Sequence, residues 1–121
     1  MTDDKTILIV DDNAPYRHLV AAFLRKDDYI TIEAEDGQQA LDMLAHQHVD
    51  AIVIDLQMMP MGGFGFIEKY TEKGYTAPVI LVTSDQDENI LEQAAHRGFC
   101  AILKKPLNEE ALLHALVNCL T

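Results

Sequence analysis

Four short apolar runs of this sequence each end in polar side chains that can do chemistry. In chain order these polar groups are Asp11-Asp12, Asp55, Thr83-Ser84 and Lys104-Lys105. Three carboxylates gathered within a few ångströms cannot all stay ionised without a compensating charge. A hard divalent cation with oxygen ligands supplies that charge, and Mg²⁺ suits a site that offers few carboxylates and retains water. Carboxylates that hold a cation, together with a lysine and a hydroxyl, form a site for phosphoryl oxygens.

Asp55 is the candidate nucleophile of such a site. It stands alone after its apolar run, between the acidic pair and the Thr/Lys groups in the expected sheet. A carboxylate that attacks a phosphoryl group forms an acyl phosphate. Each polar group also has an ordinary structural explanation as a helix cap, a turn residue or a solvated lysine. Four chemically matched groups at equivalent places are much harder to attribute to those explanations together.

The apolar runs are the expected strands, and five β-rich runs recur along the chain. They cover residues 6–10, 29–34, 51–54, 79–82 and 100–103. The runs at 6–10, 51–54 and 79–82 are apolar almost throughout, which predicts central strands of a parallel sheet that is covered on both faces. The run at 29–34 alternates apolar and polar residues and is therefore expected at an edge of the sheet.

Helical periodicity fills the gaps between these strands. Apolar residues recur at spacings of three and four around residues 16–24, 40–45, 66–70, 90–95 and 112–120. Asp36 and Asn108 are candidate N-caps, and Gly98 is a candidate helix end. The pattern predicts an α/β fold, a doubly wound (βα)₅ flavodoxin-like sheet with strand order 2-1-3-4-5, in one domain over residues 1–121. Ligands of such sheets bind at the carboxyl ends of the strands, where the polar groups lie.

Composition and charge exclude several classes of protein. The chain has 121 residues, with 20 acidic and 9 basic side chains and a formal net charge of −11. So acidic a surface repels nucleic acid and anionic lipid, and we expect neither as a direct partner. No apolar run approaches the roughly 20 residues of a membrane span. Cys100 and Cys119 are expected to be buried free thiols, which points to a reducing cytoplasm.

The polar groups and their spacing resemble the receiver domains of bacterial two-component response regulators over about residues 6–120. The resemblance rests on Ile7-Leu8-Ile9-Val10-Asp11-Asp12, Asp55 with Met58 and Gly63, Val82-Thr83, and Lys105-Pro106. It implies a phospho-accepting receiver of a phosphorelay, whose conformation switches when a sensor histidine kinase or a histidine phosphotransfer protein phosphorylates it. Such a domain catalyses its own aspartyl phosphorylation and dephosphorylation and is not a conventional turnover enzyme. An effector domain outside this chain and a homodimer are left open.

The resemblance also implies a ligand set for Mg²⁺. Asp12 and Asp55 would ligate the ion through their side chains, and Asp11 would act through water. The backbone carbonyl of Gln57 would supply a further ligand. Asp55 would be the phospho-acceptor.

The remaining implied roles concern the phosphoryl group and the switch. Lys105 would pair with one phosphoryl oxygen, and the Thr83 hydroxyl would donate to another. The Lys105–Pro106 peptide is expected to be cis, a geometry that proline permits. Thr83 and Ile102 stand at the positions that change on activation.

Two departures from the family pattern favour an alternative hypothesis. Met59 stands where the family usually has proline, with Pro60 one residue later, and Ile102 stands where an aromatic residue is common. Asp85, two residues after Thr83, would place a further carboxylate near the phosphoryl group. The alternative is a degenerate, non-phosphorylated receiver that acts as a protein-interaction module.

The sequence also bears on the parent protein and on other classes of site. The segment Val10-Asp11-Asp12-Asn13, with Arg17 close behind, resembles the receivers of hybrid histidine kinases, while a stand-alone receiver and a transcription regulator remain open. A flavin carrier would need a phosphate-binding loop, and the sequence has none that fits. An aspartate-nucleophile phosphatase would need a second aspartate where Gln57 stands.

Overall fold

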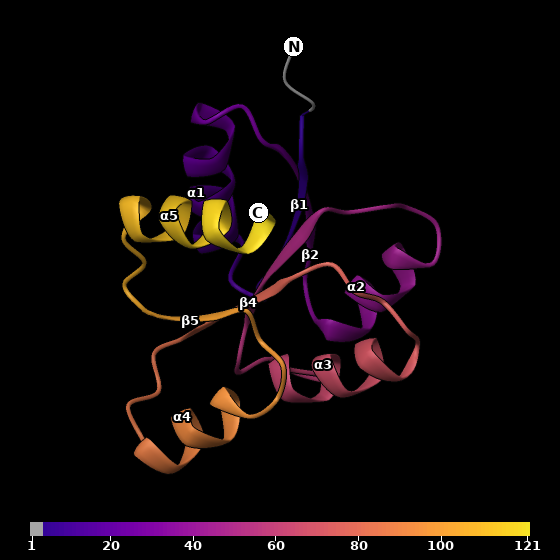
Figure 1. Cartoon of the computed structure of the whole chain (residues 1–121), viewed down its shortest axis with the longest axis vertical. Helices are drawn as coiled ribbons and strands as arrows, with labels where there is room; N and C mark the ends of the chain where they lie inside the picture. The colour runs from indigo at the N-terminus through magenta and orange to yellow at the C-terminus, as the bar shows by residue number, and fades with distance from the viewer. Residues whose placement is uncertain (1–3) are drawn as a thin grey trace.

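A five-stranded parallel sheet forms the centre of the molecule (Figure 1). The computed structural model describes residues 4–121. The strands are β1 (Thr6–Val10), β2 (Ile30–Ala34), β3 (Ala51–Asp55), β4 (Val79–Thr83) and β5 (Ala101–Lys104). Their order is β2-β1-β3-β4-β5, which confirms the predicted topology. Most of their bounds differ by one residue from those predicted.

The burial of each strand follows from its composition. β3 and β4 are buried along their whole length and β1 at every residue but the first, since helices cover both faces of the sheet. The register pairs Leu8 with Ile52 and Ile54 with Leu81, so that apolar side chains line up across the sheet. β2 and β5 are the edges and are only partly buried.

Five helices connect and flank the strands. They are α1 (Ala14–Lys26), α2 (Gly37–Leu44), α3 (Gly63–Glu72), α4 (Glu88–Ala95) and α5 (Glu109–Leu120). Asp36 and Asn108 cap α2 and α5 as predicted, each accepting a backbone N–H of the first turn. Asn13 caps α1 and Asp87 caps α4 in the same way. The acidic pair and Thr83 are therefore not needed as caps.

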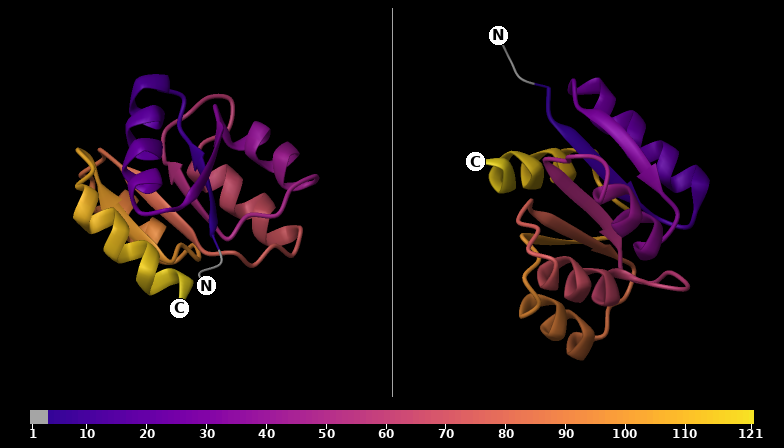
Figure 2. Two further views of the ribbon diagram at one scale, coloured as in Figure 1. Left: turned by 90° about the horizontal axis from the view of Figure 1, so that it is seen from above. Right: turned by 90° about the vertical axis from the view of Figure 1, so that its right-hand side faces the viewer.

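The helices form two layers, one on each face of the sheet. Figure 2 shows α1 (indigo) and α5 (yellow) on one side of the strands, and α2 and α3 (purple to magenta) on the other. The buried side chains divide accordingly into two clusters, because successive residues of a strand point to opposite faces. One cluster joins the sheet to α1 and α5, and the other joins it to α2, α3 and α4. Within residues 4–121, no helix has both the length and the apolar character needed to cross a membrane.

The cysteine prediction was wrong. Cys100 and Cys119 form a disulfide, and the Cys100 side chain lies at the surface. Cys100 directly precedes β5, and Cys119 lies in the last turn of α5, which packs back along β5 and returns to its start. Their Cα atoms are 6.1 Å apart, a normal separation for bonded cysteines. The argument for a reducing compartment from unpaired thiols therefore falls away.

Candidate functional site

Three carboxylates meet at the carboxyl end of the sheet. One oxygen each of Asp11, Asp12 and Asp55 can be chosen so that all lie within 4.8 Å of one another. Asp11 and Asp55 are buried, at 4% and 8% exposure, while Asp12 is open to solvent. The three side chains could hold a metal ion, as the strand order had predicted, because their oxygens suit a hard cation.

The backbone of the two central strands sets this arrangement. β1 and β3 are neighbours, and Val10 pairs with Ile54, so the residues that follow in each strand emerge side by side. The Asp11 N–H donates to the Ala34 carbonyl at 3.2 Å, and one Asp11 carboxylate oxygen accepts the Asn13 N–H at 2.9 Å. Asp11 is thereby fixed while Asp12 projects outward.

Lys105 brings a positive charge to the same place from β5. Its Nζ lies 3.2 Å from Oδ2 of Asp11 and 3.3 Å from Oδ1 of Asp55. Its backbone N–H donates to the Thr83 carbonyl at 2.9 Å, which continues the β4–β5 pairing past the end of the strand. The Lys105–Pro106 peptide is cis, the geometry expected for it, and turns the chain toward α5.

The pKa values of the lysine and of Asp55 reflect the crowding of charge. Burial raises the pKa of Asp55, and the negative charges of Asp11 and Asp12 act in the same direction against the opposing charge of Lys105. Burial alone would lower the pKa of Lys105, but attraction by Asp55 and Asp11 outweighs it and raises that pKa above its ordinary value. The ammonium therefore stays charged at neutral pH, and Asp55 remains short of compensating charge.

Thr83 ends β4 beside the strand that carries Asp55. It is buried, and its hydroxyl accepts the Asp85 N–H at 2.9 Å. Asp85 in turn accepts a hydrogen bond from Nε2 of Gln57 at 3.3 Å, so the segments after β3 and β4 are joined at the rim of the site. Ile102 is half-buried in β5, pairs with Leu81 and packs against the cluster under α2, α3 and α4.

The loop between β3 and α3 forms another wall of the site. Met58 is buried, whereas Met59 is 83% exposed and precedes a cis bond to Pro60. At Gly62 a Cβ atom would collide with the Leu56 carbonyl oxygen, so the close turn of this loop requires glycine there. A pocket of about 460 Å³ opens between this loop, Asp12 and the start of α3.

Two residues of α1 support the site, a role that the sequence reasoning gave to neither of them. The Arg17 guanidinium is nearly buried; it donates to the Asp11 carbonyl at 2.7 Å and to Glu33 at 2.8 Å. The Tyr16 ring lies under the Lys105 ammonium, with 4.3 Å from Nζ to the ring centroid. An arginine on the core-facing stripe of α1 was the available signal, because a buried cation needs a partner.

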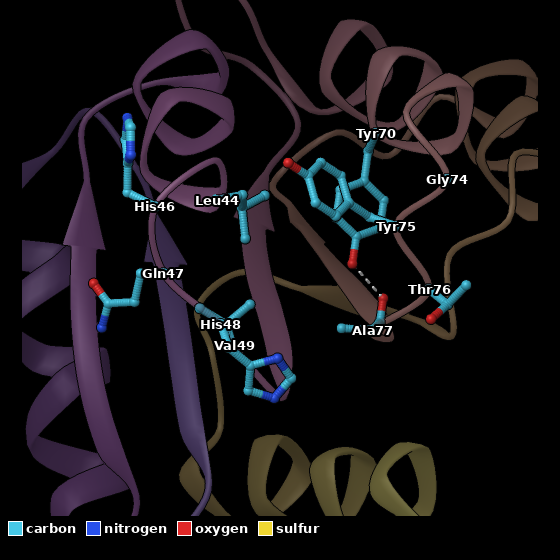
Figure 3. Close-up of a pocket in the computed structure, with 10 residues that line it drawn as sticks. All are labelled: Leu44, His46, Gln47, His48, Val49, Tyr70, Gly74, Tyr75, Thr76 and Ala77. Atoms are coloured by element: carbon cyan, nitrogen blue, oxygen red, sulfur yellow. Dashed lines mark hydrogen bonds between the residues drawn. The ribbon is translucent and has the colours of Figure 1, made fainter.

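A second pocket lies at the opposite, amino end of the sheet (Figure 3). Its volume is about 450 Å³, and its lining comes mainly from the segments that lead into β3 and β4. Val49 lines it and is buried, whereas His46 and His48 are exposed at its rim. None of the predicted site residues line this pocket.

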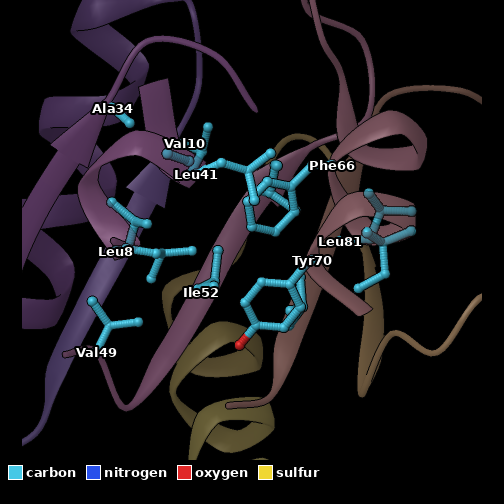
Figure 4. Close-up of a cluster of buried hydrophobic side chains, with 14 of the residues drawn as sticks. Leu8, Val10, Ala34, Leu41, Val49, Ile52, Phe66, Tyr70 and Leu81 are labelled. Atoms are coloured by element: carbon cyan, nitrogen blue, oxygen red, sulfur yellow. The ribbon is translucent and has the colours of Figure 1, made fainter. Parts of the chain in front are cut away.

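Tyr70 connects this pocket to the core. Its hydroxyl donates to the Ala77 carbonyl at 2.8 Å, and its ring stacks between Phe66 and Tyr75 with centroid distances of 5.2 Å on either side. Figure 4 shows the ring beside Ile52 and Phe66 in the cluster under α2, α3 and α4. Burial raises the pKa of Tyr70 to about 12.

Comparison with known proteins matches nearly the whole chain to one protein family. A family model described as the response regulator receiver domain matches residues 7–117. A cyclic di-GMP phosphodiesterase of Thermotoga maritima is 31% identical over 117 residues, which cover 93% of this chain and 31% of that protein. The sensor histidine kinase RcsC of Escherichia coli K12 is 32% identical over 114 residues, covering 94% of this chain and 12% of the kinase. The chain thus spans less than a third of the length of these relatives.

Solved structures of similar shape lead to the same family. The chemotaxis protein CheY4 of Vibrio cholerae superposes with a TM-score of 0.88 at 28% identity, over 97% of this chain and 99% of that one. A response regulator receiver protein from Pseudomonas putida gives a TM-score of 0.91 at 24% identity, over 98% and 99% of the two chains, a likeness of fold. With its sheet order, its acidic cluster and its lysine, the chain belongs to the response regulator receiver domain family.

Proposed function

We propose that this chain is a phospho-accepting receiver domain, with Asp55 as the acceptor. The supporting observation is that Lys105 stands within 3.3 Å of both Asp11 and Asp55, at the edge where the three carboxylates meet. A carboxylate oxygen of Asp55 attacks the phosphorus of a phosphohistidine on the donor protein. The P–N bond breaks, a P–O bond forms, and the departing imidazole takes up a proton. Later attack by water on phosphorus restores the carboxylate and releases inorganic phosphate.

The acidic cluster fits a magnesium ion. In this proposal Asp12 and Asp55 ligate Mg²⁺ directly, Asp11 acts through water, and the Gln57 backbone carbonyl supplies a further oxygen. Three carboxylates lie together with one ammonium, that of Lys105 on Asp11 and Asp55, and retain an excess of negative charge that a divalent cation would offset. When bound, the ion neutralises charge on the phosphoryl oxygens.

Lys105 and Thr83 would hold the phosphoryl group after transfer. Lys105 already points at Asp55 and exchanges one carboxylate contact for a phosphoryl oxygen. The Thr83 hydroxyl uses a lone pair to accept the Asp85 N–H and keeps its own proton for donation to a second phosphoryl oxygen. Movement of Thr83 toward that oxygen changes the packing next to Ile102 on the adjacent strand. We therefore assign the switch to these two positions.

The partners follow from this chemistry. The donor is a sensor histidine kinase or a histidine phosphotransfer protein, since the acceptor is an aspartate and the relative RcsC is itself named a sensor histidine kinase. We place the domain in the cytoplasm, where ATP charges such donors. The net charge of −11 disfavours direct contact with nucleic acid or membrane, so an effector domain beyond this chain or a homodimer would carry the output.

The test is intact-protein mass spectrometry after incubation with acetyl phosphate and Mg²⁺. We expect a gain of about 80 Da, one phosphoryl group, which chelation of the metal and Asp55→Asn each abolish. Asp42→Asn, at an exposed position of α2, is the matched control and should be phosphorylated like the wild type. No mass gain and no affinity for Mg²⁺ or beryllofluoride would overturn the proposal in favour of the protein-interaction module.

A further inference from the structure

Tyr16 is held rigidly at the start of α1, close behind the acidic pair. Its backbone N–H donates to the side chain of Asn13, the N-cap of the helix, at 2.9 Å. Its side chain leaves the helix toward the β5–α5 loop and is half-buried against the cluster under α1 and α5. The position of the ring is thus set by the element that follows Asp11 and Asp12.

The face of the Tyr16 ring supports the charged end of Lys105. The distance from Nζ to the ring centroid is 4.3 Å, within the range in which an ammonium is attracted by an aromatic face. The same Nζ contacts Asp11 at 3.2 Å and Asp55 at 3.3 Å. Three groups therefore surround the ammonium, and Tyr16 is the uncharged one.

The Tyr16 hydroxyl holds the backbone on the far side of the cis peptide. It accepts the Leu107 N–H at 3.2 Å. Because Pro106 has no N–H, Leu107 supplies the first backbone donor after Lys105. One side chain thereby contacts both the ammonium of Lys105 and the chain two residues further on.

Phosphorylation would change which anionic group Lys105 contacts. Once Asp55 is phosphorylated, the negative charge moves outward to the phosphoryl oxygens, and the ammonium must follow it. A lysine side chain is long and flexible, so a charge released from one carboxylate can move away into solvent. The ring face limits this freedom without competing for the phosphoryl group.

We propose that Tyr16 is a positioning residue that keeps Lys105 directed into the phosphorylation site. This inference rests on the proposed function, because the site must bind a phosphoryl group for the position of Lys105 to matter. Within the described residues, Tyr16 makes its hydrogen bonds to Asn13 and Leu107 and none to the three carboxylates. Its removal should therefore weaken phosphoryl binding and leave metal binding intact.

The experiment separates these two affinities. Two ligands are titrated separately by calorimetry into the wild type, Tyr16→Phe and Tyr16→Leu. One is Mg²⁺ alone, and the other is beryllofluoride, a phosphoryl mimic, in the presence of Mg²⁺. We expect Tyr16→Leu to weaken beryllofluoride binding about tenfold, with Mg²⁺ affinity within about twofold. Tyr16→Phe keeps the ring and loses the acceptor for Leu107, so its loss should be smaller. Urea unfolding confirms that each variant is folded.

Tyr29→Leu is the matched control. Tyr29 is also half-buried against the cluster under α1 and α5, but it lies before β2, at the other end of the sheet. Its replacement should lower stability as Tyr16→Leu does and leave both affinities unchanged. A purely structural role of Tyr16 predicts that the two variants behave alike, and that result would overturn the inference.

A double-mutant cycle with Lys105→Met measures the coupling between Tyr16 and Lys105 in beryllofluoride affinity. If Tyr16 acts through Lys105, Tyr16→Leu has little further effect on beryllofluoride affinity once the lysine is gone. Full additivity of the two losses, or an equal loss of Mg²⁺ affinity in Tyr16→Leu, would contradict the inference while sparing the proposed function. A wild type that binds no beryllofluoride in the presence of Mg²⁺ would overturn both.

Discussion

The two ends of the central sheet use polar side chains in opposite ways. At the amino end, two buried or half-buried polar side chains have neutral partners of their own: Tyr70 donates to Ala77, and Asp50 accepts the Thr6 N–H at 2.7 Å. At the carboxyl end, Asp11, Asp12 and Asp55 lie close together, and the ammonium of Lys105 contacts Asp11 and Asp55. The two side chains named at the amino end each have a partner, whereas the three carboxylates at the carboxyl end carry more negative charge than Lys105 offsets.

The surplus is one of charge and not of hydrogen bonds. In the described part of the chain, no buried side-chain nitrogen or oxygen lacks a hydrogen-bond partner. Asp11 and Asp55 both contact Lys105 and yet repel each other, an arrangement that suits the binding of a cation. We infer that the carboxyl end gives up stability for function, whereas the amino end supplies stability.

The largest effect is expected from Tyr70→Ala at the amino end. The change removes a ring that is 3% exposed and stacked between Phe66 and Tyr75, and it leaves the Ala77 carbonyl unpaired. We expect a loss of about 3–5 kcal/mol in the free energy of unfolding, measured in urea. A loss below about 1 kcal/mol would contradict the stabilising role given to this end.

At the carboxyl end, Asp55→Asn should instead raise the free energy of unfolding. Burial raises the pKa of Asp55, so at neutral pH its ionised form is less stable in the folded protein than in the unfolded chain. Removal of the charge should stabilise the metal-free protein by on the order of 1 kcal/mol, as measured by thermal unfolding with a chelator. By the same sign, the stability that the Asp55 charge costs should shrink as pH falls through its folded pKa, because the folded protein then protonates this carboxyl.

Magnesium should make the wild type more stable than Asp55→Asn, the reverse of the order expected without metal. Under the proposed function we expect the ion to bind the folded wild type and not the variant, so that saturating Mg²⁺ stabilises the wild type alone. Asp42→Asn serves again as the control, with no change beyond about 0.5 kcal/mol in either condition. A destabilised Asp55→Asn protein without metal would show that the carboxylates are already compensated.

The pH dependence of Tyr70→Phe sharpens the comparison. The pKa of Tyr70 is about 12 in the folded protein, against an ordinary value of 10.0. Between these values the unfolded chain ionises and the folded protein does not, so Tyr70 lowers stability as pH rises. The wild type should lose about 1 kcal/mol more than Tyr70→Phe between pH 9 and pH 11, measured by urea unfolding. Parallel curves would show that the hydroxyl is not protected by burial.

The smallest effect is expected from His48→Ala at the rim of the amino end. His48 contacts Asp50 at 3.2 Å, but its side chain is 84% exposed, so solvent weakens the pair. Asp50 keeps the Thr6 N–H as its partner. We expect a change below about 0.5 kcal/mol at pH 7.5 and at pH 5.5. A larger loss at pH 5.5 would mean that this end too depends on charge.

Much of the fold could be predicted because its central strands are apolar on both faces. Continuous runs such as 52–54 and 80–82 have few alternatives to a buried parallel strand, and their polar ends then fall at one edge. The gathering of Asp11, Asp12 and Asp55 followed from that geometry and is observed. Asn108 and Asp36 were found as caps because the cap signal is local.

The remaining features depend on contacts between distant segments. Tyr16 lay on the apolar stripe of its helix, and nothing near it in the sequence pointed to Leu107, 91 residues away. Arg17 was noticed only as part of a motif, whereas its hydrogen bond to the Asp11 carbonyl gives it a structural role. Asp87, and not Thr83, Ser84 or Asp85, caps α4, because the segment after β4 runs on before the helix begins.

The disulfide gives the β5–α5 segment a property that a linear chain lacks. Cys100 and Cys119 enclose the whole of β5, Lys105, Pro106 and nearly all of α5 in one covalent ring. A chain stretched from its two ends would not extend through this ring, whose cysteines are 19 positions apart, and its contour would be about 60 Å shorter than that of the reduced chain. A protease that cuts once inside the ring would open it without releasing a fragment. The disulfide would then hold the two halves of the cut chain together, Lys105 included, until a reductant breaks it.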